Sequence, residues 1–474
     1  MQTLPMASGY ILLIVFSLVS IGLGFYYNRG NKEESYDEFL SARSGIPLPV
    51  AISGLIAVWV WSSTLMGSGE GAYNFGMAGI WVYGVVVPLS AVVLGSWILP
   101  RVRKMMPKAA TFPAYMAKRL GPGTHKVFTF VTIVQMFFWA VLQIMAVGTI
   151  LNTMFGIPIW IAAVFSGVVV TLYITLGGLR AAAGTAFFQV LVITVLLAIL
   201  LPCAIHYAGG VNHIYEGVLS VKGQEGSLVF SKDILFNWFL VSLFSYINYS
   251  IKPGTERKFI LWSAFLWLPI PCAAGLLGVI GLSTGIQVTP SVILPAMILN
   301  LMPTIFSYGF AVIMLASIYS TAGSCLNAFS SLFVNDIYIP YIKKGRPEEK
   351  KLLPLARKMT VIGGLLASAV AVFPVSLLFM NYAVAAIAVP ITWPFVLSVC
   401  WKRLNTKATI LGMVVAIPTA LLLAFLPAIG VTVIPIPLWS GYLITHLAAL
   451  LIPIIGTVMR PNNQFDFALM RAES

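Results

Sequence analysis

Long apolar runs, separated only by short charged segments, occupy almost the whole length of this chain. Of its 474 residues, 59% are hydrophobic and 9% are charged, whereas a soluble globular domain carries about 25% charged residues. Such a chain cannot furnish an ordinary water-facing surface. Because a helix satisfies its backbone hydrogen bonds internally, we expect an all-α integral membrane protein whose helices cross the bilayer.

The charged breaks divide the apolar sequence into thirteen expected spans, each near or above the length of about 20 residues that a bilayer requires. These spans lie at roughly 9–27, 47–77, 79–100, 125–152, 157–178, 184–208, 233–252, 259–285, 305–335, 356–378, 380–401, 406–427 and 437–458. An odd number of spans would put the two termini on opposite sides of the membrane.

We group the expected spans into five parts. The parts at 47–208 and 233–401 each hold five helices, and an extracellular loop at 209–232 joins them. The first span and a cytoplasmic loop occupy 1–46, and two peripheral helices with a short cytoplasmic tail occupy 402–474.

The positive charges indicate which way the spans run. Cytoplasmic loops of membrane proteins carry an excess of Lys and Arg. If the N-terminus is outside, every Lys and Arg except Lys222 and Lys232 lies in or beside a cytoplasmic segment. We therefore expect a multi-pass protein of the inner (plasma) membrane with its C-terminus in the cytoplasm. The net charge of +14 then needs no nucleic-acid partner to explain it.

Two long spans contain residues that weaken or interrupt a helix. Gly67, Gly69, Gly71 and Gly76 follow one another in the span at 47–77, and each glycine costs a helix about 1 kcal/mol relative to alanine. The span at 305–335 contains a polar run at 317–324. Interrupted helices often form a transporter's binding site, so we expect both spans to be broken there.

Hydroxyl side chains in these spans suggest a cation site. Ser317, Ser320, Thr321 and Ser324 share one helical face, beside Gly323. A single Ser or Thr in a span most often bonds to its own helix carbonyl. Four together, near an unwound helix that offers carbonyl oxygens, favour a site for sodium.

A second candidate site lies in the middle of the first broken span, where Trp59, Trp61, Ser62, Ser63 and Thr64 follow closely on one another. Tryptophan usually lies at the headgroup level of a bilayer, so two at mid-span could wall a small polar pocket. Tryptophans two positions apart point in different directions, however, and one of them could simply pack.

Ionisable groups are almost absent from the spans, although such groups usually mark function there. Glu70 is the one carboxylate well inside a span. It could carry a proton, or it could reach water or backbone amides near the outer end of a broken helix. The spans show no nucleophile–base pair and no metal-ligand spacing, so the sequence offers no site for an enzyme.

Four stretches in order along the chain, from about residue 36 to 400, resemble the signatures of the sodium/solute symporter family. They are Gly177-Gly178-Leu179-Arg180-Ala181 with Thr185 and Gln189; Thr111-Phe112-Pro113 with Lys118-Arg119; Gly69-Glu70-Gly71-Ala72-Tyr73 with Gly76; and Ser320-Thr321 with Ser324, Leu326, Asn327, Ser330, Ser331 and Asp336-Ile337-Tyr338. The run at 59–65 is most similar to the urea/polyamine transporter-like branch.

The resemblance implies about thirteen spans, a five-plus-five inverted-repeat core with broken helices, and transport by alternating access. It also implies a sodium site made of carbonyls of Ala57, Val60 and Ser317 and hydroxyls of Ser320 and Thr321. The implied substrate site lies alongside, formed by Trp59, Trp61, Ser62, Ser63, Thr64, Tyr246 and Asn248.

The chain departs from the family pattern at two positions. The family usually carries Asp directly after the residue at Thr185, where this chain has Ala186, and some members use that Asp with further hydroxyls for a second sodium. One of those hydroxyl positions is Gly323 here. We therefore expect a single coupling sodium, or none.

These features favour a sodium-coupled symporter that imports a small polar organic solute. Urea or a similar small amide is the first choice, since no Lys or Arg lies at mid-membrane to pair with a carboxylate. A helix N-terminus can bind a carboxylate, so amino acids and short carboxylates remain open, as does proton coupling. A protein of a different functional class, a non-transporting membrane sensor, is the other alternative, although the tail after 458 is short for a signalling domain. The expected partners are substrate, sodium and lipid, with no nucleic acid and no obligate protein.

Overall fold

The computed structural model describes residues 3–28, 36, 48–81, 84, 92, 95–106, 111–227, 256–345, 348–373, 377–468 and 470. Every regular element within these residues is helical. The main helices are α1 (Met6–Asn28), α3 (Leu48–Trp59), α4 (Ser62–Phe75), α6 (Ser96–Met105), α7 (Phe112–Leu120), α8 (Pro122–Phe155), α9 (Ile159–Tyr207), α10 (Val211–Ser227), α13 (Glu256–Trp267), α14 (Pro269–Ser283), α15 (Ile293–Leu301), α16 (Thr304–Leu332), α17 (Glu349–Val370), α18 (Leu377–Cys400), α19 (Thr406–Ala420), α20 (Leu426–Ala428) and α21 (Leu438–Met459).

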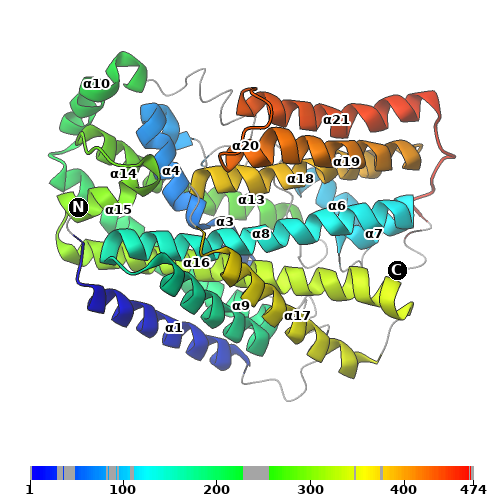
Figure 1. The fold of residues 1–474 in the computed structure, drawn as a ribbon, viewed down its shortest axis with the longest axis horizontal. Coiled ribbons are helices and arrows are strands. Elements are labelled where there is room, and N and C mark those ends of the chain that lie inside the picture. The colour runs from blue at the N-terminus through cyan, green and yellow to red at the C-terminus, as the bar shows by residue number, and fades with distance from the viewer. Residues whose placement is uncertain are drawn as a thin grey trace.

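Within the described residues, ten single helices and one bent pair are long and apolar enough to cross a bilayer. They follow the expected spans in order. The expected spans at 79–100 and 233–252 lie largely outside the described residues, so the number thirteen stays a prediction. In Figure 1, α1 begins and α21 ends at opposite ends of the bundle, as an odd number of spans requires.

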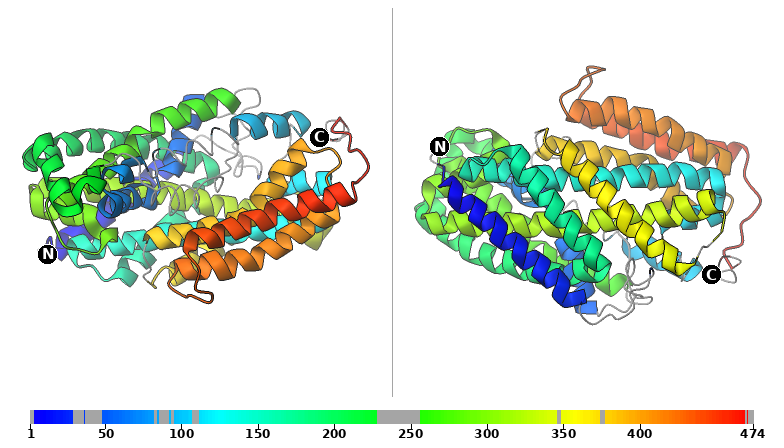
Figure 2. Two further views of the ribbon diagram at one scale, coloured as in Figure 1. Left: turned by 90° about the horizontal axis from the view of Figure 1, so that it is seen from above. Right: turned by 60° about the horizontal axis from the view of Figure 1, so that its bottom comes forward.

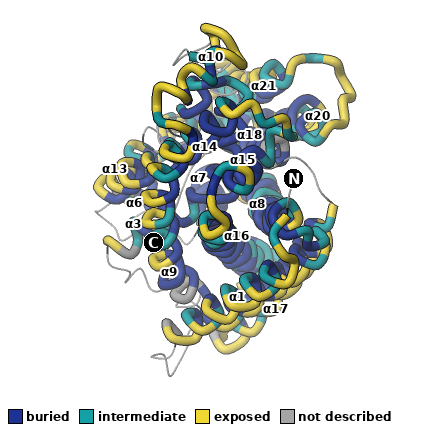
Figure 3. The backbone as a smooth tube through the Cα atoms, turned by 90° about the vertical axis from the view of Figure 1, so that its left-hand side faces the viewer, coloured by how far each residue is buried: buried dark blue, intermediate teal, exposed yellow. Residues whose placement is uncertain are grey.

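Apolar side chains cover the outside of the bundle as well as its interior. Ile11 and Leu18 of α1 are each 63% exposed, and Leu366 of α17 is 54% exposed. Figure 3 shows the exposed turns of α1 and α17 on the outer side of the buried helices around α16. A soluble monomer rarely exposes large apolar patches, so these faces are suited to lipid.

The centre of the bundle is α16, which packs against both α8 and α9. The pair α19 and α21 lies on the opposite side from α1 and α17, against α18 (Figures 1 and 2). Between 209 and 232, the expected loop contains the helix α10. The long α9 joins two expected spans across a kink at Gly178, whose φ of 52° favours glycine.

The first broken span is broken as expected, although not at its glycines. The segments Ala51–Trp59 and Ser62–Ile80 meet at an angle of 49°, whereas Gly67, Gly69 and Gly71 lie inside the regular helix α4. A Cβ on Gly69 would lie 2.5 Å from Leu294 Cγ, so this glycine permits close helix packing.

The second expected break is wrong, because α16 runs without interruption through residues 317–324. Ser320 and Thr321 each donate to Ser317 O, at 2.8 and 3.2 Å, and Ser324 donates to Ser320 O at 2.9 Å. Three of the four Ser and Thr hydroxyls of the run, those of Ser320, Thr321 and Ser324, thus bond to carbonyls of their own helix. Polar residues that bond in this way do not force a helix to unwind.

Candidate functional site

The break between α3 and α4 is stabilised by side chains that replace lost helical hydrogen bonds. The N–H of Ser62, which would bond to Val58 O in a continuous helix, donates to Gln143 Oε1 of α8 at 2.9 Å. Thr64 Oγ1 donates back to Trp59 O at 2.7 Å. A break inside a membrane needs such partners, since an unsatisfied backbone group there costs several kcal/mol.

The same break leaves carbonyls at the end of α3 facing hydroxyls of α16. Ala57 O accepts from Ser320 Oγ at 3.1 Å and from Thr321 Oγ1 at 3.2 Å. Both hydroxyl oxygens also lie within hydrogen-bond distance of Ser317 O, so each shares its single proton between the two carbonyls. Residues more than 260 positions apart in the chain thus form one fully buried cluster of oxygen atoms.

This cluster brings together four of the five residues that we expected to hold sodium. Carbonyls at the C-terminal end of an interrupted helix suit a cation, because the helix dipole is negative there. The hydroxyl of Ser317 is buried without a hydrogen-bond partner among the described residues. Val60 lies at the break itself and donates its N–H to Ile56 O at 2.7 Å; no described contact joins its carbonyl to Ser320 or Thr321. Sodium binding at this cluster stays a prediction.

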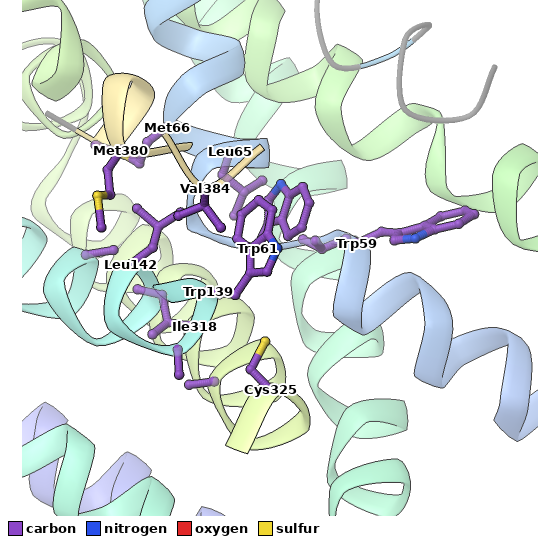
Figure 4. Packing of buried hydrophobic residues seen from close by; sticks show 14 of the residues in the cluster. Trp59, Trp61, Leu65, Met66, Trp139, Leu142, Ile318, Cys325, Met380 and Val384 are labelled. Carbon is purple, nitrogen blue, oxygen red and sulfur yellow. The ribbon is translucent and has the colours of Figure 1, made fainter. Parts of the chain in front are cut away.

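The two tryptophans of the break point to opposite sides of the chain (Figure 4). Trp61 stacks on Trp139 of α8, with ring centroids 4.2 Å apart and an interplanar angle of 13°. Trp59 packs edge-on against Trp267 of α13 at 6.0 Å. Trp61 therefore lies on the α8 side of the break with the serines, whereas Trp59 packs on the other side.

A small polar site surrounds the beginning of α4. Ser63 Oγ donates to Asn381 Oδ1 of α18 at 3.2 Å. Gln143 Nε2 and Ser62 Oγ are both fully buried, and neither has a hydrogen-bond partner among the described residues. Leaving such a group buried and unsatisfied costs about 1–3 kcal/mol. The arrangement is therefore suited to a ligand that supplies the missing partners.

Sequence reasoning missed Trp139, Gln143 and Asn381. Trp139 and Gln143 are one turn apart on α8, so they present one face to the break. A signal was available, since Gln143 and Asn381 are isolated amides within apolar runs. The expected site residues Tyr246 and Asn248 lie outside the described residues. The hydroxyl of the expected residue Thr64 donates to Trp59 O at the end of α3.

Glu70 lies in α4, about 12 Å along the helix from Ser62 at the usual rise per residue. Its side chain is 5% exposed, and Oε2 has no hydrogen-bond partner among the described residues. The carboxyl group is thus largely buried among the packed helices around α4. No group of three or more His, Cys, Asp and Glu that could hold a metal ion occurs in the described parts of the chain.

Two of the signature stretches meet at the N-terminal ends of α7 and α8. Thr111 Oγ1 donates to Asp336 Oδ1 at 2.9 Å, and it also caps α7 by accepting from Ala114 N. His125 Nε2 lies 3.0 Å from the same carboxylate oxygen. These contacts join α7, α8 and the π-helical end of α16 at Phe333–Lys343.

Comparisons with known proteins agree with this architecture. The model of the sodium:solute symporter family matches residues 39–255 and 258–416. The chain is 22% identical to a probable urea active transporter of Schizosaccharomyces pombe, over 86% of this chain and 69% of that protein. It is 23% identical to the sodium/pantothenate symporter of Escherichia coli, over 85% of this chain and 88% of that protein. A bovine sodium-coupled monocarboxylate transporter is 24% identical, over 90% of this chain and 73% of that protein.

Two solved structures share the fold. A sodium-coupled sialic acid symporter, in a substrate-bound outward-open state, superposes with a TM-score of 0.78 at 17% identity, covering 96% of this chain and 99% of that one. A nucleobase-cation-symport-1 family transporter has a TM-score of 0.56 at 14% identity, and the match covers 94% of this chain and 99% of that one. These proteins are secondary transporters and not enzymes. The chain therefore belongs to the sodium:solute symporter family.

Proposed function

We propose that this protein is a sodium-coupled symporter that imports a small, neutral, polar organic solute across the plasma membrane, with its N-terminus outside. The observation that carries the proposal is the oxygen cluster in which Ser320 and Thr321 of α16 contact Ala57 O at the break of α3. Family membership supports sodium as the coupled ion.

The geometry supports a direct route for coupling. The oxygen cluster involves the end of α3 just before the break, and the polar site of Ser62 and Ser63 lies at the beginning of α4 just after it. A sodium ion between α3 and α16 would fix the position of α3, and with it the beginning of α4. Substrate bound to Ser62 and Gln143 would fix the same segment, so each ligand raises the affinity for the other.

The lining of the site favours a neutral solute. No Lys or Arg occurs at 44–100, 127–179 or 359–401, so α3, α4, α18 and α8 beyond its first turns offer no cation to pair with a carboxylate. Gln143 offers amide N–H groups, and Ser62 a hydroxyl, to a carbonyl oxygen. The stacked rings of Trp61 and Trp139 would pack against a flat molecule. These features fit urea or a small amide, and they are in keeping with relatives named as urea transporters.

A second substrate class has specific support. Relatives are also named for pantothenate and monocarboxylates, and the neighbouring structure is named for sialic acid. Amide and hydroxyl donors can hold a carboxylate without a cationic side chain. Short carboxylates and amino acids are therefore the second candidate class.

Uptake into proteoliposomes would test the proposal. An inward sodium gradient is imposed, and labelled urea, short amides, amino acids and short carboxylates are supplied in turn. We expect accumulation of a neutral amide that stops when potassium replaces sodium. Accumulation of carboxylates alone would overturn the substrate class, and uptake of every active solute without sodium would overturn symport.

Replacing Glu70 with Gln is expected to leave sodium-driven uptake close to that of the wild type. Glutamine keeps the shape of the buried side chain and removes only its ability to release a proton. The measurement is uptake driven by a sodium gradient at uniform pH, beside uptake driven by a pH gradient without sodium. Wild-type uptake that follows the pH gradient and is lost in Glu70→Gln would show proton coupling instead.

A further inference from the structure

Two side chains of the peripheral helix α21 bond to α18, the helix that carries Asn381. The Tyr442 hydroxyl donates to Tyr382 O, the carbonyl of the residue that follows Asn381 in the chain. The indole N–H of Trp393 donates to His446 Nδ1 at 2.9 Å. Tyr442 and His446 are one turn apart on α21, so they share one face of that helix. This face packs against α18 (Figure 1).

The middle of α18 lacks two of its own helical hydrogen bonds. Pro390 and Pro394 lie inside the helix, and a proline has no N–H to donate to the carbonyl four residues before it. The carbonyls of Ala386 and Pro390 therefore receive no such bond. Trp393 lies between the two prolines, so its bond to His446 supports α18 where these helical bonds are missing.

The C-terminal end of α18 is held by α7 instead. The guanidinium group of Arg119 donates to Ser398 O at 3.1 Å and to Trp401 O at 2.7 Å. It also lies over the ring of Phe465 in the tail after α21, 4.4 Å from the ring centroid. The prolines separate this anchor from the half of α18 that carries Asn381, so that half needs a support of its own.

We propose that Tyr442 is a positioning residue for substrate binding, because its bond to Tyr382 O holds Asn381 in place. The inference rests on the proposed function. The side chain of Asn381 is 1% exposed, and its Oδ1 accepts from Ser63 Oγ in the polar site. A shift of the backbone at 381–382 would move this amide away from Ser63. The peripheral helix α21 thus sets the affinity for substrate without touching it.

Hydrogen exchange in nanodiscs, with sodium and without substrate, tests the support of α18. Tyr442→Phe is expected to speed amide exchange at residues 380–389 by about 3–10-fold, since one buried hydrogen bond is lost. Thr445→Val is the matched control, because Thr445 is also fully buried on α21 and donates to Gly441 O of its own helix. This control should exchange like the wild type. Unchanged exchange in Tyr442→Phe would overturn the inference, whatever solute the protein transports.

A double-mutant cycle tests whether Tyr442 acts through Asn381, with labelled urea as the probe of sodium-driven uptake. Tyr442→Phe should raise the KM by about 3–10-fold with little change in kcat, and Thr445→Val should change neither. In an Asn381→Ala chain, Tyr442→Phe should have no further effect on the KM, because the side chain that it positions is gone.

Effects on the KM that multiply would overturn the inference, since Tyr442 would then act by a route other than Asn381. A wild-type protein that takes up amino acids or carboxylates but no urea or other amide would overturn only the proposed substrate class. The cycle is then run with the transported solute, and the same two outcomes decide it.

Discussion

Replacing Ser320 and Thr321 with Ala is expected to remove the sodium dependence of uptake. Each hydroxyl contacts Ala57 O and Ser317 O in the buried oxygen cluster. A hydrogen bond or ligand contact to a charged group contributes about 1.5–3 kcal/mol. Loss of either hydroxyl should therefore weaken sodium binding by about tenfold or more. The double variant should show no sodium response in the usual concentration range.

The measurement is initial uptake as a function of sodium concentration in proteoliposomes. Ser330→Ala is a matched control, because Ser330 is also fully buried on α16 and bonds only to Asn327 O of its own helix in the described contacts. This control should keep the wild-type sodium response. A double variant with an unchanged sodium response would mean that the cation binds elsewhere.

Changing Gln143 is expected to separate the two roles of its side chain. Gln143→Met removes the oxygen that accepts from Ser62 N as well as the buried amide N–H groups, and it should abolish uptake because the break loses its support. Gln143→Glu keeps an oxygen for Ser62 N but removes the donors that face the site. Its KM should rise by about 10–100-fold, the equivalent of one lost buried hydrogen bond.

Uptake kinetics over a range of substrate concentrations would distinguish these outcomes. Thr132→Val serves as the control, since Thr132 lies on the same helix and donates to Phe128 O of its own backbone. It should retain the wild-type KM. A Gln143→Glu variant that also retains the wild-type KM would exclude the amide from contact with substrate.

The spans could be predicted from the sequence because the bilayer imposes their length and their apolar character. The broken span at 47–77 was predicted for a partly wrong reason. Gly69 permits close packing against Leu294. The break falls earlier, at Val60 and Trp61, where Gln143 and Thr64 supply replacement hydrogen bonds. The expected break in α16 failed because its hydroxyls bond to their own helix.

By itself, the sequence determined a helical membrane protein, the order of its spans and the hydroxyl residues of the oxygen cluster on α16, whereas Ala57 was expected there only from the resemblance to the symporter family. Local patterns suffice for these features, since hydropathy and helical spacing act over one or two turns. Only the tertiary structure decided that Ser320 meets Ala57, that Gln143 and Asn381 contact the break, and that Tyr442 bonds to the carbonyl of Tyr382. Those contacts join residues 60 to 318 positions apart, and they depend on how whole helices pack, which no local pattern encodes.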